Sequence, residues 1–385
     1  MLDLDTIQKQ IEMNKRKKYL EAHPFAIWKG NDNKWHTYLP DEDKGRIPRK
    51  RNTKKEIEDV IVEYWIEQER NPTIGEVFYD WLNDKLEFQE IGKSTYDRYI
   101  TDFEKYFVSI KKRRIRTIEE EELERFVKGC IAEYNMTSKC FSNFRTLIYG
   151  VFKRAKKRKL VNFSITEVMK DMEVSRKSFK KVIKKAEEQV YDSQEKPLME
   201  TYLIENEDII NLGLLLMFKT GLRIGELSTI KTDEIKDYII PVNRTETRYK
   251  DENGNARYEV KEFPKSEAGL RFAIIPSQYK WIIDRILELN SGSEYLFSKD
   301  GKRIKTYSFR RRLRYICEEK IHIVPKSPHK IRKTYGTILL DGKVKESTLL
   351  ETMGHADISV TKNHYYFDRT GIEEKRTELD KIKEL

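Results

Sequence analysis

The chain has 385 residues, too many for one compact core, so its length predicts two or three domains. Hydrophobic residues make up 38% and charged residues 37%, a balance that excludes a disordered chain and predicts folded domains with highly charged surfaces. The net charge of +11 favours a polyanionic partner. Nucleic acid is the preferred candidate, and an anionic membrane surface is the second, because no lipidation motif occurs.

The sequence favours a cytoplasmic location. No run of about eighteen apolar residues occurs, and Met1–Lys18 lacks the apolar core of a signal peptide. The three cysteines, Cys130, Cys140 and Cys317, have no metal-ligand spacing. We therefore expect reduced cysteines, no membrane partner and no zinc.

Residues 1–70 are predicted to form a three-stranded sheet packed on a helix. After a polar helix over Met1–Lys18, three β-like runs follow at Pro24–Lys29, Lys34–Pro40 and Lys44–Lys50, separated by turn sequences. Thr53 can cap the next helix, Lys54–Arg70. The sheet is either a solvated surface or a DNA-binding one. Its candidate DNA contacts are Trp28, Lys29, Arg49, Lys50 and Arg51.

Residues 72–173 are predicted to form a helical bundle. Thr73–Glu76 is a capping box, and four apolar stripes with helical spacing follow, the last over Ser138–Lys159. Basic clusters at the helix ends can hold phosphates by charge without reading sequence. The candidates are Lys112, Arg113, Arg114, Lys153 and Lys157. A basic linker over 174–184 leads to the next domain.

The next domain opens with an apolar helix over Asp208–Thr220 that ends at Gly221. Arg223 follows the glycine turn, and Glu226, three residues later, can hold its guanidinium in place. Strands are predicted at Ile239–Val242, Arg257–Phe263 and Gly269–Pro276. Lys265 is expected at the tip of the hairpin between the last two strands, from which its side chain can reach a phosphate.

The stretch from His329 to Tyr365 gathers further polar groups. His329 and Arg332 share one face at the start of a helix predicted over Lys330–Leu340, where the helix dipole favours an anion. Gly354-His355 and Tyr365-Tyr366 follow. Alone, the His-x-x-Arg pair is more often a solvated surface feature, and the two tyrosines could be a core pair.

Five motifs in order resemble the tyrosine recombinases, and within them the integrases of temperate phages and conjugative transposons. They are Thr220–Leu227, Lys265 before a strand, Ser327–Arg332, Met353–Thr361, and the tyrosine ten residues after His355. The resemblance implies a multidomain fold, mainly α with small β-sheets. It would comprise an N-terminal arm-type DNA-binding domain, a helical core-binding bundle, a mixed α/β catalytic domain over 185–372 and a tail helix over 373–385.

The resemblance also implies roles for individual residues. Arg223 and Arg332 would hold the non-bridging oxygens of a DNA phosphate, and His329 and His355 would add hydrogen bonds and manage protons. Lys265 would protonate the leaving 5′-oxygen, and Tyr365 would be the nucleophile. Tyr366 remains a rival, because many relatives have a small residue and a histidine after the tyrosine, where this chain has Tyr366 and Phe367.

These roles predict a site-specific recombinase that integrates and excises a mobile element through a 3′-phosphotyrosyl intermediate and a Holliday junction, without metal, ATP or another cofactor. The expected partners are double-stranded DNA with core and arm sites, three further copies in a tetramer, and an excisionase or DNA-bending accessory protein. The expected location is the nucleoid in the bacterial cytoplasm. Alternatives are a type IB topoisomerase, and an accessory DNA-binding protein without catalysis. In the family the tail docks on a neighbouring protomer, with Leu379, Ile382 and Leu385 as the expected anchors here.

Overall fold

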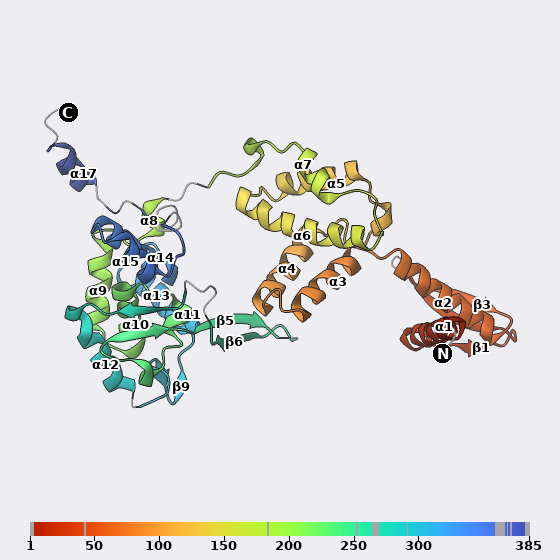
Figure 1. The fold of residues 1–385 in the computed structure, drawn as a ribbon, viewed down its shortest axis with the longest axis horizontal. Coiled ribbons are helices and arrows are strands. Elements are labelled where there is room, and N and C mark those ends of the chain that lie inside the picture. Colours follow the sequence, from red (N-terminus) through yellow and green to blue (C-terminus); the bar gives the residue numbers. More distant parts are fainter. Residues whose placement is uncertain are drawn as a thin grey trace. The chain divides into compact units, whose positions relative to one another are not determined.

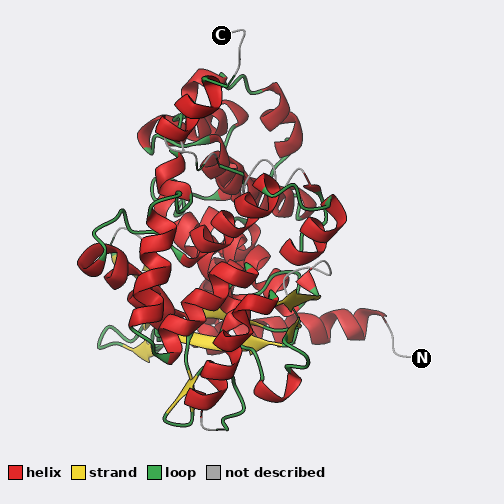
Figure 2. Ribbon diagram, turned by 90° about the vertical axis from the view of Figure 1, so that its left-hand side faces the viewer, coloured by secondary structure: helices red, strands yellow, loops and turns green. Residues whose placement is uncertain are grey.

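A computed structural model of the chain describes residues 4–41, 44–182, 185–251, 253–263, 269–290, 292–358, 366–367, 369 and 372–381. Helices make up most of the described chain, and the strands form small antiparallel sheets (Figure 2). The predicted fold class is thereby confirmed. The chain divides into two compact units, Met1–Lys181 and Val182–Leu385. Among the described helices, none combines the length and the apolar character that a membrane span requires.

The first unit begins with a helix, a three-stranded sheet and a second helix. The elements are α1 (Leu4–Ala22), β1 (Trp28–Lys29), β2 (Trp35–Asp41), β3 (Gly45–Arg51) and α2 (Lys54–Arg70), with the strands in the order β1-β2-β3. Thr53 and Glu56 form the reciprocal capping box that starts α2. This confirms the predicted three strands and helix, although β1 is only two residues long.

The sheet has one covered face and one open face. Thr37 and Leu39 of β2 are buried, as are Ile57 and Ile61 of α2, which packs on β2 and β3. Side chains alternate along a strand, so Tyr38 and the other even-numbered residues of β2 face away from α2.

The rest of the first unit is the predicted helical bundle. Its helices are α3 (Ile74–Glu87), α4 (Lys93–Tyr106), α5 (Glu120–Glu133), α6 (Ser138–Lys157) and α7 (Ile165–Asp171), with 3₁₀ turns at Ile115–Thr117 and Arg176–Ser178. The capping box of Thr73 and Glu76 starts α3 as expected. Aromatic side chains fill the core, where the rings of Phe78 and Phe103 stack with centroids 3.8 Å apart. The short helix α7 was not predicted.

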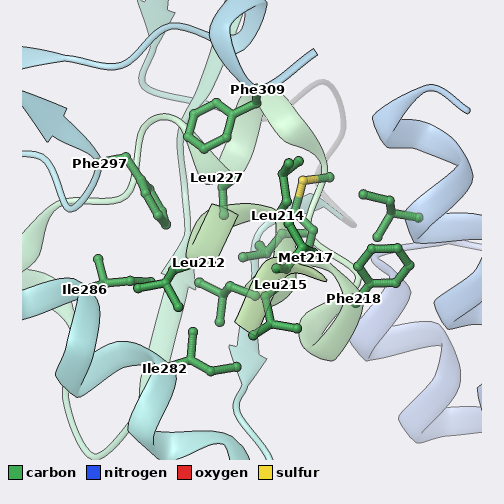
Figure 3. Packing of buried hydrophobic residues seen from close by; sticks show 14 of the residues in the cluster. Leu212, Leu214, Leu215, Met217, Phe218, Leu227, Ile282, Ile286, Phe297 and Phe309 are labelled. Atoms are coloured by element: carbon green, nitrogen blue, oxygen red, sulfur yellow. The ribbon is translucent and has the colours of Figure 1, made fainter. Parts of the chain in front are cut away.

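The second unit is built around α10 (Ile209–Thr220), whose residues from Asn211 onward are all buried. Figure 1 shows helices on several sides of α10, and Figure 3 shows its leucines packed against Ile282, Ile286, Phe297 and Phe309. The other helices are α8 (Ala186–Gln189), α9 (Glu195–Glu205), α11 (Ile224–Leu227), α12 (Lys280–Asn290), α13 (Thr306–Tyr315), α14 (Pro328–Asp341), α15 (Glu346–Met353) and α17 (Ile372–Leu379). Short 3₁₀ turns lie at Thr232–Glu234 and Ser277–Tyr279, and a π-helical turn at Ile316–Lys320 follows α13.

The strands of this unit pair differently from the prediction. β4 (Ile239–Val242) pairs with β7 (Arg271–Ile274), β5 (Thr245–Lys250) with β6 (Ala256–Lys261), and β8 (Ser298–Lys299) with β9 (Lys302–Arg303). The strands on either side of Lys265 are therefore not each other's partners, and the predicted hairpin is wrong. The prediction failed because it missed β5, a strand in which threonines alternate with charged residues. β5 pairs with β6, and β7 pairs with β4 instead of β6.

Candidate active site

Arg223 lies at the junction of α10 and α11. Gly221 ends α10 with a left-handed φ of 65°, and Arg223 begins the next short helix. The Nη1 and main-chain N–H groups of Arg223 both donate to the Glu226 carboxylate, each at 2.8 Å. The expected contact between Glu226 and the Arg223 guanidinium is thus present, and 36% of the Arg223 side chain remains exposed.

Helix α14 carries His329 in its first turn and Arg332 one turn later. Arg332 is wholly buried, although the His-x-x-Arg pattern alone favoured a surface feature. Its Nη1 donates to the Gly221 carbonyl at 2.7 Å. Its Nη2 donates to the Met353 carbonyl and, at 3.2 Å, to Nε2 of His355. Arg332 therefore joins three separate segments of the chain.

His355 follows α15, which ends at Gly354 in a left-handed conformation. The His355 main-chain N–H donates to the Leu350 carbonyl at 3.1 Å, and only 9% of the residue is exposed. The left-handed turn at Gly354 thus directs His355 toward Arg332, whereas His329 keeps an exposed surface.

Arg271 completes the base of the site and was not among the predicted residues. Its Nη2 and Nη1 donate to the two carboxylate oxygens of Glu226 at 2.8 Å and 3.1 Å, and its Nε donates to the Thr352 carbonyl at 3.0 Å. The side chains of Glu226 and Arg271 are each 2% exposed. The available signal was position: Arg271 alternates with Ala273 and Ile275, so it lies on the buried face of its strand.

The ionisation of Glu226 follows from these contacts. Burial alone raises the pKa of the Glu226 carboxyl, but the hydrogen bonds and charge of Arg271, together with the charges of Arg223 and Arg332, outweigh burial and hold this pKa at about 2. Glu226 is therefore an anion that keeps several guanidinium groups close together.

Both histidines are neutral near pH 7. Desolvation first, and then the charges of Arg332, Arg223 and Arg271, lower the pKa of His355 to about 3. Desolvation, followed by the charges of Lys333, Arg332, Arg223 and Lys330, lowers the pKa of His329 to about 4. The charges of Arg223 and Arg332 act on both rings, so the two histidines lie in one positive field. A phosphate bound there would raise both histidine pKa values.

Lys265 and Tyr365 lie outside the described residues, so their predicted roles stay predictions. Of the two neighbouring tyrosines, only Tyr366 is described, and 49% of it is exposed. Beyond it, the Phe367 N–H donates to Thr337 Oγ1 at 3.3 Å, and Arg369 Nε donates to the Tyr191 carbonyl at 2.9 Å. Of the expected tail anchors, Leu379 is 54% exposed, and Ile382 and Leu385 are not among the described residues.

A pocket of about 530 Å³ opens beside this cluster. It is lined by Ile224, Arg310, Arg314, Pro325, Lys326, Ser327, Pro328 and His329. Two of its three cationic side chains already have carboxylate partners, since Lys326 donates to Glu195 and Arg314 donates to Glu318. In the part of the chain that the structure describes, no three His, Cys, Asp or Glu side chains gather as metal ligands. The expectation that no metal or cofactor is required stays a prediction.

The sheet of the first unit divides its predicted DNA contacts between two faces. Trp28, His36 and Lys50 are in register across the three strands, on the open face. The Trp28 ring stacks on His36 with centroids 5.6 Å apart. Lys29, Arg49 and Arg51 belong to the other register, whose inner positions face α2. Arg46, which was not predicted, lies over the Tyr38 ring at 4.3 Å on the open face.

The predicted contacts of the bundle also separate into two groups. Arg113 is bonded to Glu122, and Arg114 Nη1 donates to the Asn71 carbonyl at 3.1 Å, so both have structural partners. Lys112, Lys153 and Lys157 are exposed. Lys153 and Lys157 lie one turn apart on α6, which makes them a short cationic stripe.

The comparisons with known proteins agree with this fold. Residues 188–370 match the model of the phage integrase family. The chain is 31% identical to a XerC-like tyrosine recombinase of Caldanaerobacter subterraneus subsp. tengcongensis, over 39% of this chain and 44% of that protein. The curated relatives are thus matched over less than half of their length.

Two solved integrase structures share the fold at low sequence identity. One is the integrase of transposon Tn1549 in complex with a circular intermediate DNA, with 16% identity, a TM-score of 0.56, and coverage of 80% of this chain and 99% of that one. The other is lambda integrase, crystallised as a tetramer bound to a Holliday junction, with 14% identity, a TM-score of 0.54, and coverage of 90% and 95%. Residues 188–370, slightly less than half of the chain, are therefore similar to the phage integrase family in sequence, and the two solved integrases share the fold.

Proposed function

We propose that this chain is a site-specific DNA recombinase that integrates and excises a mobile element by cutting and rejoining DNA through a tyrosine. The observation that carries the proposal is the gathering of Arg223, Arg332, His329 and His355 over the buried Glu226–Arg271 pair. Guanidinium groups aimed at one point stabilise the charge that builds on the oxygens of a phosphodiester under attack.

The two arginines have different positions relative to that phosphate. Arg223 is partly exposed, so it meets the DNA first. Arg332 is buried, and its Nη groups now donate to two carbonyls and a histidine. To donate to the phosphate, Arg332 exchanges one of these partners, and until then it contributes through its charge. The neutral His329 and His355 rings supply hydrogen bonds and can take up a proton.

Tyr365 is the proposed nucleophile. Its phenolate oxygen forms a bond to the DNA phosphorus, the bond from phosphorus to the 5′-oxygen breaks, and Lys265 gives that oxygen its proton. The 3′-phosphotyrosyl bond keeps the energy of the broken phosphodiester, so a second 5′-hydroxyl rejoins the strand without ATP. A tyrosine has an ordinary pKa near ~10, and the surrounding cations make its phenolate available near neutral pH.

The proposed partner is double-stranded DNA. The bundle over 72–173 binds the core site through Lys112, Lys153 and Lys157, and the domain over 1–70 binds an arm site through the open face of its sheet. The basic linker 174–184 joins the bundle to the catalytic domain. The likeness to a lambda integrase tetramer on a Holliday junction supports four copies acting on two duplexes.

Trapping on a nicked suicide substrate tests the proposal. The nick lets the short leaving strand dissociate, so the covalent adduct cannot be rejoined and accumulates. We expect an adduct with the full chain, and at least a ~100-fold slower reaction with Arg223→Lys, since lysine lacks the planar fork. A chain that binds the substrate but gives no adduct is a DNA-binding protein. Relaxation of supercoiled DNA without sequence preference would instead indicate a topoisomerase.

A further inference from the structure

Just beyond the proposed nucleophile, two described residues attach the chain to the rest of the second unit. The Phe367 N–H donates to Thr337 Oγ1 at 3.3 Å. The Nε of Arg369 donates to the Tyr191 carbonyl at 2.9 Å. The two attachments are two residues apart, so they fix both the position and the direction of this short segment.

Both attachments end on buried parts of the protein. Thr337 belongs to α14, the helix that carries His329 and Arg332, and is wholly buried. Tyr191 is also wholly buried, and its N–H donates to Thr334 Oγ1 on the same helix at 2.8 Å. A support of this kind transmits little motion, because close-packed interiors deform very little.

The buried Lys333 contacts both the segment beyond Tyr365 and the chain just before Tyr191. Lys333 Nζ lies 4.6 Å from the centroid of the Phe367 ring and donates to Gln189 Oε1 at 2.9 Å. Lys330 Nζ bonds to the same Gln189 oxygen. We name Ala186–Tyr191 the strap. It begins two residues after the end of the predicted linker and contacts both α14 and the segment beyond Tyr365.

We propose that Phe367 and Arg369 are positioning residues, which clamp the chain beyond Tyr365 to α14 and the strap of their own protomer. The inference rests on the proposed function. Only Tyr366 lies between Tyr365 and Phe367, and an advance of two positions along the chain spans at most about 7 Å. The clamp therefore limits how far the phenol can move from the helix that carries His329 and Arg332. A displacement of ~1 Å at a reacting centre can cost about 100-fold in rate.

The test uses the full chain with Arg369→Ala, Arg369→Lys and the control Arg285→Ala. Arg285 is an arginine of the same unit whose partners, Glu207 and Glu288, lie away from the site. Adduct formation is followed in single turnover, and DNA affinity is measured separately. We expect Arg369→Ala to slow adduct formation at least 10-fold at unchanged affinity. Lysine should restore part of the rate, because it can still donate to the Tyr191 carbonyl, and Arg285→Ala should match the wild type.

A second readout is hydrogen exchange at the Phe367 amide in the protein without DNA, which does not depend on catalysis. We expect faster exchange in Arg369→Ala and not in Arg285→Ala. An active wild type, with an Arg369→Ala variant that reacts as fast or exchanges at the same rate, overturns the clamp and leaves the proposed function standing. A wild type that binds DNA without forming an adduct overturns both.

Discussion

Glu226 is the residue on which the geometry of the site depends. Its carboxylate binds Arg223 on the exposed side and Arg271 on the buried side, and Arg271 in turn donates to the Thr352 carbonyl just before His355. A buried anion between cations holds the charged groups at a separation that they would not keep alone. The same arrangement makes the residue costly to change.

We expect Glu226→Gln to destabilise the second unit by roughly 3–5 kcal/mol, because it leaves the Arg271 guanidinium buried without a counter-charge. Hydrogen exchange of the α10 amides in increasing urea measures the free energy of unfolding of this unit within the full chain. The matched control is Glu288→Gln, whose side chain is 64% exposed beside Arg285 and which should change stability by less than about 0.5 kcal/mol. Equal effects of the two substitutions would contradict the central role of Glu226.

The histidines predict how stability depends on pH. The pKa values of His355 and His329 in the folded chain, about 3 and about 4, lie below the ordinary 6.5. The unfolded chain therefore binds more protons in this range, and stability falls as the pH falls from 6.5 toward 4. The pKa of Glu226, about 2 against an ordinary 4.5, adds a further loss from pH 4.5 downward.

Hydrogen exchange of the α10 amides in increasing urea, repeated at several pH values, measures how the free energy of unfolding depends on pH. His355→Gln should flatten the slope between pH 6.5 and 4, and the control His322→Gln, at an exposed histidine, should leave it unchanged. An unaltered slope in His355→Gln would show that His355 does not carry the effect.

At the scale of elements, local sequence signals predicted the bounds of helices well, but they predicted the pairing of strands poorly. The helix α2 has the predicted bounds because Thr53 and Glu56 form a capping box and an apolar stripe follows. Strand pairing depends on contacts between distant residues. β5 carries little apolar alternation, so it was missed, and the hairpin around Lys265 was misassigned. The burial of Arg332 and the role of Arg271 depend on partners such as Met353 and Thr352, which no local pattern indicates.

The turn at Gly221 tests the link between α10 and the site. A Cβ atom at this position would lie 2.2 Å from Cδ1 of Tyr335, and φ is already 65°. We expect Gly221→Ala to cost clearly more than the ~1–2 kcal/mol of a left-handed alanine, because the clash also displaces the carbonyl that binds Arg332. Gly254→Ala is the control, since φ is 77° there and, among the described residues beyond its chain neighbours, nothing lies within 4 Å of such a Cβ. Similar costs at both positions in urea unfolding would contradict this account.

At the scale of the whole molecule, the exposed lysines on α6 predict the salt dependence of DNA binding. Each phosphate contact contributes about 0.9 to the slope of log affinity against log salt, so Lys153→Ala with Lys157→Ala should lower the slope by roughly 1.8 without altering sequence preference. The control pair is Lys85→Ala with Lys128→Ala, because these lysines are paired with Glu90 and Glu124. An unchanged slope in the α6 double variant would place the DNA on another face of the bundle.

The central claim is that the gathered cations serve one tyrosine. Peptide mapping by mass spectrometry of the trapped adduct tests it most directly, in the wild type and in separate Tyr365→Phe and Tyr366→Phe variants. We predict that the nucleotide is attached to Tyr365, that Tyr365→Phe gives no adduct, and that Tyr366→Phe still does. A nucleotide on Tyr366, or an adduct that persists in Tyr365→Phe, would contradict the account.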